Sequence, residues 1–406
     1  MTALASANPS EPAVLELTRR LIAAQSPNLP GDERAVAEVV AQALRERGLP
    51  EPRVLAKEPH RPNLLTTIDF GPGGRHLCLC GHLDTKPVGS APWQTDPLRP
   101  TVQDGHLYGL GACDMKGALA AMIEAAAALA RFGPDRGRLS LLFTADEENG
   151  ALYGARFLAK TGAVEADALL IGEPGGIDQG WDRLHLGSRG IANLVIEVLG
   201  DQGHSSLSDV RPYVSATVQL ARLLVAFADG FRPSAPEHPL APGGPTVNPG
   251  VRIAGGVGYG VVPGAAEFAV DVRTTPGMTK EAFVAELEEF LRAQRTADPR
   301  LRAAVRFEPT PRDWLPPTAV DPGHALAEAV RQAMAAVLGS APPDGLFPGA
   351  TDAAWLHGLA GIPTLPACGP GLLERAHRAD ERVSVRELEE AVTIYQQTAT
   401  IFCGAR

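Results

Sequence analysis

The sequence contains no apolar run that approaches the roughly 20 residues needed by a membrane-spanning helix. Its first residues, MTALASANPSEPAVLEL, contain no basic segment followed by an apolar core, so we expect no secretion signal. Cysteine is scarce and odd in number, with five residues at positions 78, 80, 113, 368 and 403. Without a secretion signal, this count favours reduced thiols over disulfides. We therefore expect a cytoplasmic protein that does not act at a membrane.

The sequence also has no excess of basic residues. Lysine and arginine number 37 against 47 aspartates and glutamates, which gives a formal net charge of −10. A nucleic-acid partner would require a basic surface to contact its phosphates, so we expect none. The 406 residues are more than one compact core usually holds, and their composition, 45% hydrophobic and 21% charged, is that of an ordinary globular protein. Two domains are therefore expected.

Helices and strands alternate along most of the chain. Apolar residues at helical spacing predict helices over residues 12–24, 33–48, 116–132, 211–229, 279–295, 324–338 and 384–402. Short apolar or alternating runs predict strands over residues 63–70, 77–81, 139–144, 168–171, 193–199, 251–254 and 265–272. This alternation is typical of an α/β fold with a mainly parallel sheet. The middle of the chain has the pattern of a small α+β domain. We therefore predict a discontinuous larger domain, residues 1–186 and 307–406, with a smaller domain, residues 187–306, inserted into it.

Polar residues follow three of the predicted buried strands directly. They are His82 and Asp84 after residues 77–81, Glu147 and Glu148 after residues 139–144, and Glu173 after residues 168–171, joined by Asp114 just before the helix at 116–132. Open α/β sheets bind ligands at the carboxyl ends of their strands. So many carboxylates at one edge would repel one another strongly without a cation. The arrangement therefore favours a divalent metal site.

A second imidazole is available from His377, in a loop near the C-terminus. Two cations with about four ligands each, sharing one carboxylate, would be held by His82, Asp114, Glu148, Glu173 and His377. Glu147 and Glu148 are adjacent and point in different directions, so one can bind metal while the other stays free. A free carboxylate beside a metal-bound water is what a general base requires.

Each of these features also has a simpler structural interpretation. Taken alone, a His-x-Asp pair at a strand end is more often structural, an acidic turn such as residues 146–148 is usually solvated, and a loop histidine such as His377 usually lies at the surface. Cys78 and Cys80 are better interpreted as small buried hydrophobic residues than as zinc ligands. The string GGVGYG at 255–260 lacks the strand-to-helix context of a nucleotide site and is interpreted as a turn.

Longer motifs carry a family resemblance. They are SPNLPGDE at 26–33, GHLDTKPVG at 81–89, WQTDP at 93–97, LYGLGACDMKGALAA at 107–121, TADEENGALYGA at 144–155, IGEP at 171–174 and AHRADERV at 376–383. With them the chain resembles, over nearly its whole length, the metallopeptidase family that includes acetylornithine deacetylase, succinyl-diaminopimelate desuccinylase, aminoacylase and glutamate carboxypeptidase, the M20 family. The resemblance implies a di-metal catalytic domain with an inserted lid and dimerisation domain, and hence a homodimer.

The family pattern also implies a role for each residue at the predicted metal site. The implied roles are first-metal ligands for His82 and Glu173, a metal bridge for Asp114, second-metal ligands for Glu148 and His377, general base and acid for Glu147, and orientation of His82 for Asp84. Family members that act as deacylases tend to have Glu at the position of Glu173, whereas many peptidases have Asp there.

The predicted inserted domain matches the family through GSRGIANLVIEVLGDQGHSS at 187–206 and DVRTTPG at 271–277. The resemblance implies that His204 reaches across the dimer and stabilises the oxyanion in the other subunit's site. It also implies that Arg273 and Asn248 hold the substrate carboxylate, since arginine binds carboxylates through two hydrogen bonds. Without the resemblance, His204 is interpreted as a loop residue and Arg273 as a surface residue at a strand end.

Two positions depart from the family pattern. Relatives often have NVVP where this chain has Gly260-Val-Val-Pro263, so we expect the lid to lack an amide contact. Lys86 adds a cation just after His82 and Asp84. A simple ion pair between Lys86 and a surface carboxylate is the plainer explanation of that lysine.

The sequence thus predicts a hydrolase of an amide C–N bond in an N-acyl amino acid, with a small substrate that carries a carboxylate. Two divalent cations, zinc or else manganese or cobalt, would activate water, with Glu147 as the base. A carboxypeptidase or dipeptidase would use the same machinery, and another C–N bond, such as that of an aryl amine, stays open. Outside the enzymes, the alternative is a non-catalytic relative that binds ligands, and the intact set of Glu147 and metal ligands argues against it.

Overall fold

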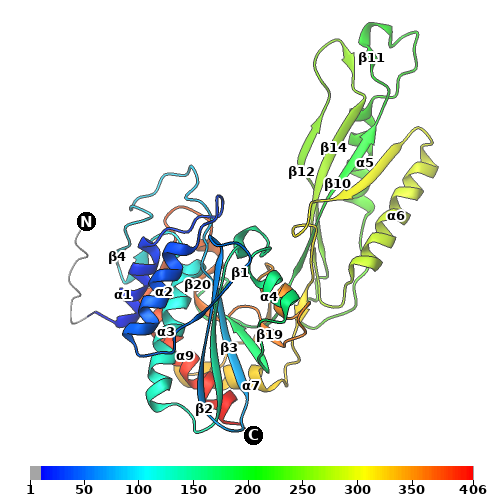
Figure 1. Ribbon diagram of the computed structural model, residues 1–406. Coiled ribbons are helices and arrows are strands. Elements are labelled where there is room, and N and C mark those ends of the chain that lie inside the picture. Colours follow the sequence, from blue (N-terminus) through cyan, green and yellow to red (C-terminus); the bar gives the residue numbers. More distant parts are fainter. Residues whose placement is uncertain (1–10, 406) are drawn as a thin grey trace. The chain divides into compact units, whose positions relative to one another are not determined.

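The computed structural model describes residues 11–405, which form two compact units (Figure 1). The first unit comprises the chain up to Ser188, Ala319–Phe347 and Thr351 onward, and the second comprises Arg189–Thr318 and Pro348–Ala350. The second unit continues past the predicted boundary at residue 306 because β16 (Trp314–Leu315) pairs with β10 (Gly190–Leu199) of the same unit. The assignment of the two units as catalytic and lid domains stays a prediction.

The first unit is built on a six-stranded sheet with the order β1-β2-β6-β3-β7-β19. Its strands are β1 (Arg53–Ala56), β2 (Pro62–Gly71), β3 (His76–His82), β6 (Gly137–Thr144), β7 (Ala168–Ile171) and β19 (Thr364–Leu365). β6, β3, β7 and β19 run parallel to one another, whereas β2 is antiparallel to its neighbours β1 and β6. Every residue of β3 is buried, as expected of a strand covered on both faces. The predicted α/β class with a mainly parallel sheet is confirmed.

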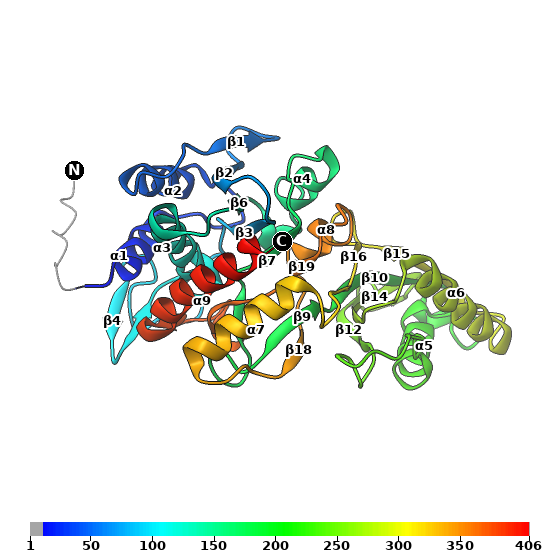
Figure 2. The same cartoon turned by 90° about the horizontal axis from the view of Figure 1, so that it is seen from below.

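The helices of the first unit pack against this sheet or against one another. They are α1 (Ala13–Ala23), α2 (Arg34–Glu46), α3 (Gly117–Phe132), α4 (Ala155–Thr161), α7 (Ala325–Leu338), α8 (Ala353–Leu356) and α9 (Val385–Gly404). α9 packs against both α3 and α7, and the three lie side by side in Figure 2. α3 is buried on nearly every side, and its alanines let neighbouring backbones approach closely.

Short strands complete the first unit. β4 (Thr101–Gln103), β5 (His106–Tyr108) and β21 (Arg382–Ser384) form one sheet, and β8 (Pro174–Gly176) pairs with β20 (Gly369–Leu372). β9 (Leu184–Ser188) pairs in parallel with β18 (Asp344–Phe347), and β17 (Thr318–Ala319) carries the chain back into this unit. The pairing of β5 with β21 joins the segment that precedes Asp114 to the segment that follows His377.

The second unit has an antiparallel sheet with the path β12-β14-β10-β15 and two helices. Its elements are β10 and β16 (given above), β11 (Gly203–His204), α5 (Ala216–Gly230), β12 (Thr246–Gly255), β13 (Val261–Val262), β14 (Ala265–Thr274), α6 (Lys280–Ala297) and β15 (Arg302–Phe307). Every second residue of β14 is buried, which gives the sheet one face for the core. Phe227, Phe268 and Leu287 are among the residues of that core, which draws on both helices and the sheet.

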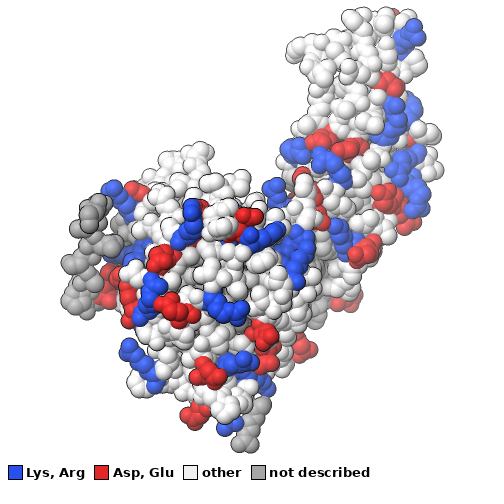
Figure 3. Space-filling model, in the orientation of Figure 1, with Lys and Arg blue, Asp and Glu red and all other residues white. Residues whose placement is uncertain are grey.

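Two sequence expectations can be compared with the described residues directly. Within residues 11–405, no helix is both long enough and apolar enough to cross a membrane. All five cysteines have free and buried thiols, and Cys78 and Cys80 lie inside β3. This agrees with their interpretation as small buried hydrophobic residues. On the face shown in Figure 3, acidic and basic side chains are intermixed.

Candidate metal centre

The register of the parallel strands brings the predicted ligands to one edge of the sheet. β3 pairs His82 with Thr144 of β6, and it pairs Cys80 with Ile171 of β7. His82 is therefore level with the end of β6, and Glu173 follows the end of β7 at the same height. Parallel strands that end together direct their next residues to a common edge.

His82, Asp114 and Glu173 form the first cluster, and all three are buried. Nε2 of His82 lies 2.9 Å from Oδ1 of Asp114 and 3.6 Å from Oε1 of Glu173. Nδ1 of His82 lies 2.9 Å from the main-chain carbonyl oxygen of Asp84, which can only accept a hydrogen bond. A proton on Nδ1 therefore leaves the Nε2 lone pair directed at two carboxylates, where a cation would bind.

Asp114, Glu148 and His377 form the second cluster. Nε2 of His377 lies 3.1 Å from Oδ2 of Asp114 and 3.0 Å from Oε2 of Glu148. The histidine belongs to a loop and has a φ of +59°, and its side chain is 48% exposed. Asp114 therefore directs one oxygen to each of two imidazoles. This is the placement expected of a carboxylate that bridges two cations.

The donor set fits divalent metal ions. In each cluster the ligand atoms all lie within 4.8 Å of one another. Imidazole and carboxylate are ligands that zinc and related metals accept. Burial lowers the pKa of His377, but its hydrogen bonds to Asp114 and Glu148 outweigh burial and raise that pKa to about 10. Bound protons therefore balance the carboxylates of the cation-free protein, and a cation would take over that task.

Glu147 differs from its neighbour Glu148. It belongs to neither cluster, and among the described residues its carboxylate makes no hydrogen bond or ion pair. Burial raises the pKa of Glu147 well above its usual range; the imidazole of His82 opposes this, while the carboxylates of Asp352 and Glu148 add to it. A carboxyl group that is free, close to the clusters and of raised pKa has the properties of a general base.

Asp84 contacts His82 in a different way from the prediction. Its main-chain carbonyl takes the hydrogen bond of the ring, while its nearest carboxylate oxygen lies 3.6 Å from Nδ1 of His82. The two carboxylate oxygens of Asp84 instead accept the main-chain N–H groups of Glu147 and Glu148, each at 3.1 Å. The carboxylate of Asp84 therefore fixes the turn that carries both glutamates, and its main-chain carbonyl forms the shorter contact with the imidazole.

A buried polar network, which the sequence analysis did not predict, supports the turn that carries Glu147 and Glu148. Asn28 donates to Asp84 at 2.8 Å and to Asp146 at 2.9 Å. Arg61 donates to both oxygens of Glu33, at 2.7 and 2.8 Å, and to Asp146 at 2.9 Å. All five side chains are buried. Asn28 and Glu33 lie in one of the quoted family motifs, which is the signal that points to them.

Glu381 holds the segment that carries Asp114. One of its oxygens accepts the N–H groups of Cys113 and Asp114, at 3.0 and 3.1 Å, and the other accepts that of Gly111 at 3.0 Å. Glu381 was not among the predicted site residues, although it lies in the same motif as His377. That motif therefore contains one candidate ligand, His377, and fixes the backbone of another, Asp114.

Lys86 pairs with Glu148, which is not the surface carboxylate predicted for it. Nζ of Lys86 lies 3.0 Å from Oε2 of Glu148, whose side chain is only 4% exposed. The main-chain N–H of Lys86 donates to the other oxygen, Oε1, at 3.1 Å, and Nζ also contacts the main-chain carbonyl of Glu148. Burial lowers the pKa of Lys86, but the Glu148 carboxylate raises it above its usual value, so the ammonium stays charged at neutral pH.

The other predicted site residues belong to the second unit. His204 lies in β11, is exposed, and accepts hydrogen bonds at Nδ1 from the backbone N–H and the hydroxyl of Ser206. Asn248 of β12 pairs with Asp271 of β14. Arg273, two residues along β14, donates to both carboxylate oxygens of Asp271, at 2.9 and 3.0 Å. Asn248, Asp271 and Arg273 thus share one face of this sheet.

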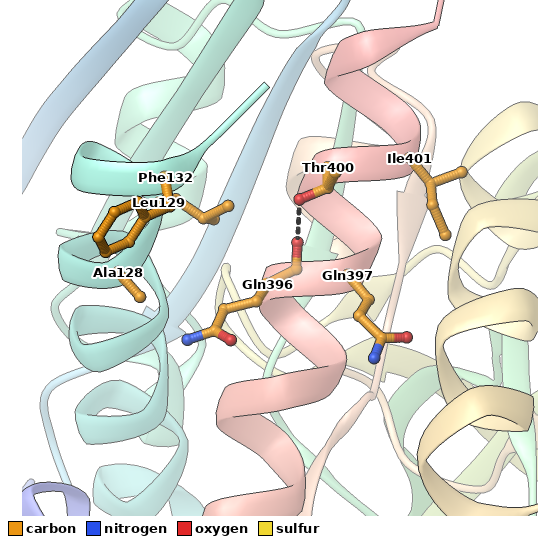
Figure 4. A pocket seen from close by; sticks show the side chains of 7 residues that line it. All are labelled: Ala128, Leu129, Phe132, Gln396, Gln397, Thr400 and Ile401. Atoms are coloured by element: carbon orange, nitrogen blue, oxygen red, sulfur yellow. Dashed lines mark hydrogen bonds between the residues drawn. The ribbon is translucent and has the colours of Figure 1, made fainter. Parts of the chain in front are cut away.

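A separate depression of about 490 Å³ lies between α3 and α9 (Figure 4). It is lined by Ala128, Leu129, Phe132, Gln396, Gln397, Thr400 and Ile401. The hydrogen bond drawn in Figure 4, from Thr400 to the carbonyl of Gln396, is internal to α9. The lining of this depression offers neither a charged group nor a metal ligand.

Comparison with known proteins places this geometry in a family. The sequence model of the family described as Peptidase family M20/M25/M40 matches residues 78–400. The chain is 32% identical over 396 residues to a succinyl-diaminopimelate desuccinylase of Rhizorhabdus wittichii, covering 94% of this chain and 96% of the relative. It is 30% identical over 409 residues to an acetylornithine deacetylase of Photorhabdus laumondii subsp. laumondii, covering 97% of this chain and 98% of the relative.

Solved structures of low sequence identity share the fold. An M20 family metallo-carboxypeptidase of Sulfolobus solfataricus matches with a TM-score of 0.75 at 18% identity, over 96% of this chain and 99% of the other. A dinuclear metal-binding peptidase of the M20 family from Bacillus subtilis matches with a TM-score of 0.68 at 18% identity, over 96% of this chain and 97% of the other. On the family match and the identities to curated relatives, the chain belongs to peptidase family M20/M25/M40 and is a hydrolase that acts on carbon–nitrogen bonds.

Proposed function

We propose that the chain is a metal-dependent hydrolase that cleaves the amide bond of an N-acyl amino acid. The strongest support is the position of Asp114, whose two oxygens face His82 and His377 separately. Glu173 would complete the first cation site and Glu148 the second. When bound, the two cations would polarise the substrate carbonyl and lower the pKa of a water molecule toward ~7. The ligand types favour zinc, and cobalt or manganese would also fit.

Glu147 would carry the proton in this reaction. It takes a proton from the attacking water as the water oxygen bonds to the carbonyl carbon. It then gives that proton to the amine nitrogen as the C–N bond breaks, so no covalent enzyme intermediate is needed. Asp84 supports this role, because its carboxylate holds the backbone of Glu147 and Glu148.

The second unit would provide the lid and the contact between subunits of a homodimer. His204 would donate to the oxyanion that forms on the carbonyl oxygen in the other subunit's site. Arg273 and Asn248 would hold the substrate carboxylate. The guanidinium of Arg273 already forms an ion pair with Asp271. The substrate carboxylate would therefore have to displace Asp271 or bind the guanidinium together with it.

The preference for an acylated amino acid comes from two sources. The relatives that cover nearly the whole chain are a desuccinylase and a deacetylase by name. The residue that completes the first cluster is Glu173, where many peptidases of the family have Asp. A cytoplasmic location is proposed from the composition and the five free cysteines.

A hydrolysis screen tests the proposed function. Metal-free protein is supplied with zinc, cobalt or manganese and offered N-acetyl, N-succinyl and N-formyl amino acids together with dipeptides. We expect metal-dependent release of amine from at least one N-acyl amino acid, and release about 10²–10⁴-fold slower from a Glu147→Gln variant purified in parallel. Turnover of dipeptides alone would overturn the deacylase assignment. Release that persists without metal would overturn the proposed chemistry.

A further inference from the structure

We propose that Lys86 makes the second cation site weaker than the first, so that the two cations bind in separate steps. The inference rests on the proposed two-cation centre. It concerns a residue that supplies no ligand atom but contacts one of the ligands. The family resemblance assigns no function to Lys86.

The contacts of Lys86 are concentrated on one ligand, Glu148. The main-chain N–H of Lys86 donates to Oε1 of Glu148, and its ammonium lies 3.0 Å from Oε2. A single residue therefore contacts both carboxylate oxygens. A cation in the second cluster must therefore share Glu148 with a fixed positive charge. Charge-assisted bonds of this kind draw electron density from the carboxylate and restrict its rotation.

The two clusters otherwise have matching ligand sets. Each combines one imidazole with two carboxylates, and Asp114 belongs to both. Behind the first imidazole lies the carboxylate of Asp84, 3.6 Å from Nδ1 of His82. Beside the second cluster lies the ammonium of Lys86. A divalent ion at the first site therefore meets an additional negative charge, whereas an ion at the second site meets an additional positive one.

The difference in burial between the two imidazoles should also make the second cation site weaker than the first. The carboxylates of the two clusters are similarly buried, with the side chains of Glu173 and Glu148 7% and 4% exposed, but the side chain of His82 is 1% exposed and that of His377 is 48% exposed. The second site is therefore open to solvent on the side of His377, and water screens the ammonium of Lys86, which is 36% exposed, in part. Exposure alone would also weaken the second site, so the contribution of Lys86 has to be measured by changing its charge.

Removal of that charge gives the test. Zn²⁺ and Co²⁺ are titrated into metal-free full-length protein by calorimetry, and cobalt binding is also followed by its absorption spectrum. The wild type should bind a first cation tightly and a second more weakly. In Lys86→Met the second affinity should rise roughly tenfold, the scale of one unit charge acting on a divalent ion in a partly screened site. The first affinity should change much less.

Two control variants separate charge from packing. Lys86→Arg keeps the positive charge and should keep the weak second step. Lys160→Met removes an exposed lysine of α4 and should leave both steps unchanged. Thermal unfolding of each metal-free variant shows that it is folded, which is expected because the Lys86 side chain is partly exposed.

The outcomes distinguish the inference from the proposed function. Stepwise binding in the wild type with an unchanged second affinity in Lys86→Met would overturn the role of Lys86 and leave the two-cation centre in place. Two equal affinities in the wild type would also overturn the role of Lys86 and leave the two-cation centre in place. A wild-type protein that binds no second cation would overturn the two-cation centre and the inference together.

Discussion

At the residue scale, Asp114 connects the two clusters. Its Oδ1 lies 2.9 Å from His82 and its Oδ2 lies 3.1 Å from His377, so each oxygen faces a different imidazole. The carboxyl of Glu381 accepts hydrogen bonds from the main-chain N–H groups of Asp114 and of Cys113 before it. Glu147 lies outside both clusters and is therefore available for proton transfer.

Replacement of Glu147 by Gln should remove catalysis without removing metal. The amide cannot accept a proton from water, so kcat should fall by about 10²–10⁴-fold, the usual contribution of a general base. Metal content measured by elemental analysis should match the wild type, because Glu147 belongs to neither cluster. Near-normal turnover in this variant would rule out the assigned base.

Metal affinity should increase with pH because of His377. The pKa of this histidine is raised to about 10 in the cation-free protein, so at pH 7 the ring is protonated. A cation binds only the neutral ring, so a cation that binds the second cluster at pH 7 must displace the proton of His377. Calorimetry of zinc binding in buffers of different ionisation enthalpy measures the proton release. His377→Ala should lose this proton and the weaker cation; full metal stoichiometry in that variant would contradict the assignment.

At the scale of elements, buried polar and charged side chains stabilise the turn after β6. Its residue Asp146 has a φ of +65°, in the left-handed region, and accepts hydrogen bonds from both Arg61 and Asn28. Arg61 also binds Glu33 and stacks on the ring of Tyr153, with its guanidinium carbon 5.1 Å from the ring centre. The turn η2 (Glu147–Asn149) that carries the proposed base therefore depends on side chains far away in the sequence.

Replacement of Arg61 by Met should destabilise the protein strongly. It leaves the buried carboxylates of Glu33 and Asp146 without their cation, and the loss of one partner of a buried pair costs about 3–5 kcal/mol. Urea unfolding measures the change in the free energy of unfolding. Arg34→Met, which removes an exposed pair with Asp32, should cost far less, because solvent screens that pair. Equal effects of the two variants would show that the buried network does not stabilise the turn.

At the scale of the whole molecule, the chain has two cores. That of the second unit draws on β10, β14, α5 and α6, all within Arg189–Thr318. The metal clusters belong to the first unit, whose chain is interrupted by the second. Apart from Pro348–Ala350, the second unit is one continuous segment with its own core, which is what a domain needs to fold alone.

Residues 189–318 expressed alone should therefore fold. We expect a cooperative thermal transition in circular dichroism that does not change when a chelator is added, because the clusters lie elsewhere. In the full chain, added zinc should raise the unfolding temperature of one transition only. A segment that shows no cooperative transition would mean that the second unit requires the first.

The sequence predicted the fold correctly where the local pattern of apolar residues determines the structure. The strand at 77–81 and the helix at 116–132 are strongly apolar, and the structure has β3 and α3 there. β1, β5 and β18 were missed, because strands of three or four residues carry too few positions to show a period. The extension of the second unit to Thr318 was also missed, since the pairing of β16 with β10 joins segments far apart in the chain.

The sequence by itself determined which residues could bind metal, because His82, Asp114, Glu148, Glu173 and His377 stand at strand ends and within family motifs. Only the tertiary structure decided what holds them. The carboxylate of Asp84 holds the turn that carries Glu147 and Glu148, and Lys86 contacts Glu148 rather than a surface acid. Such partners are chosen by distance in space, and hydrogen bonds form between side chains that the fold brings within about 3 Å, whatever their separation along the chain.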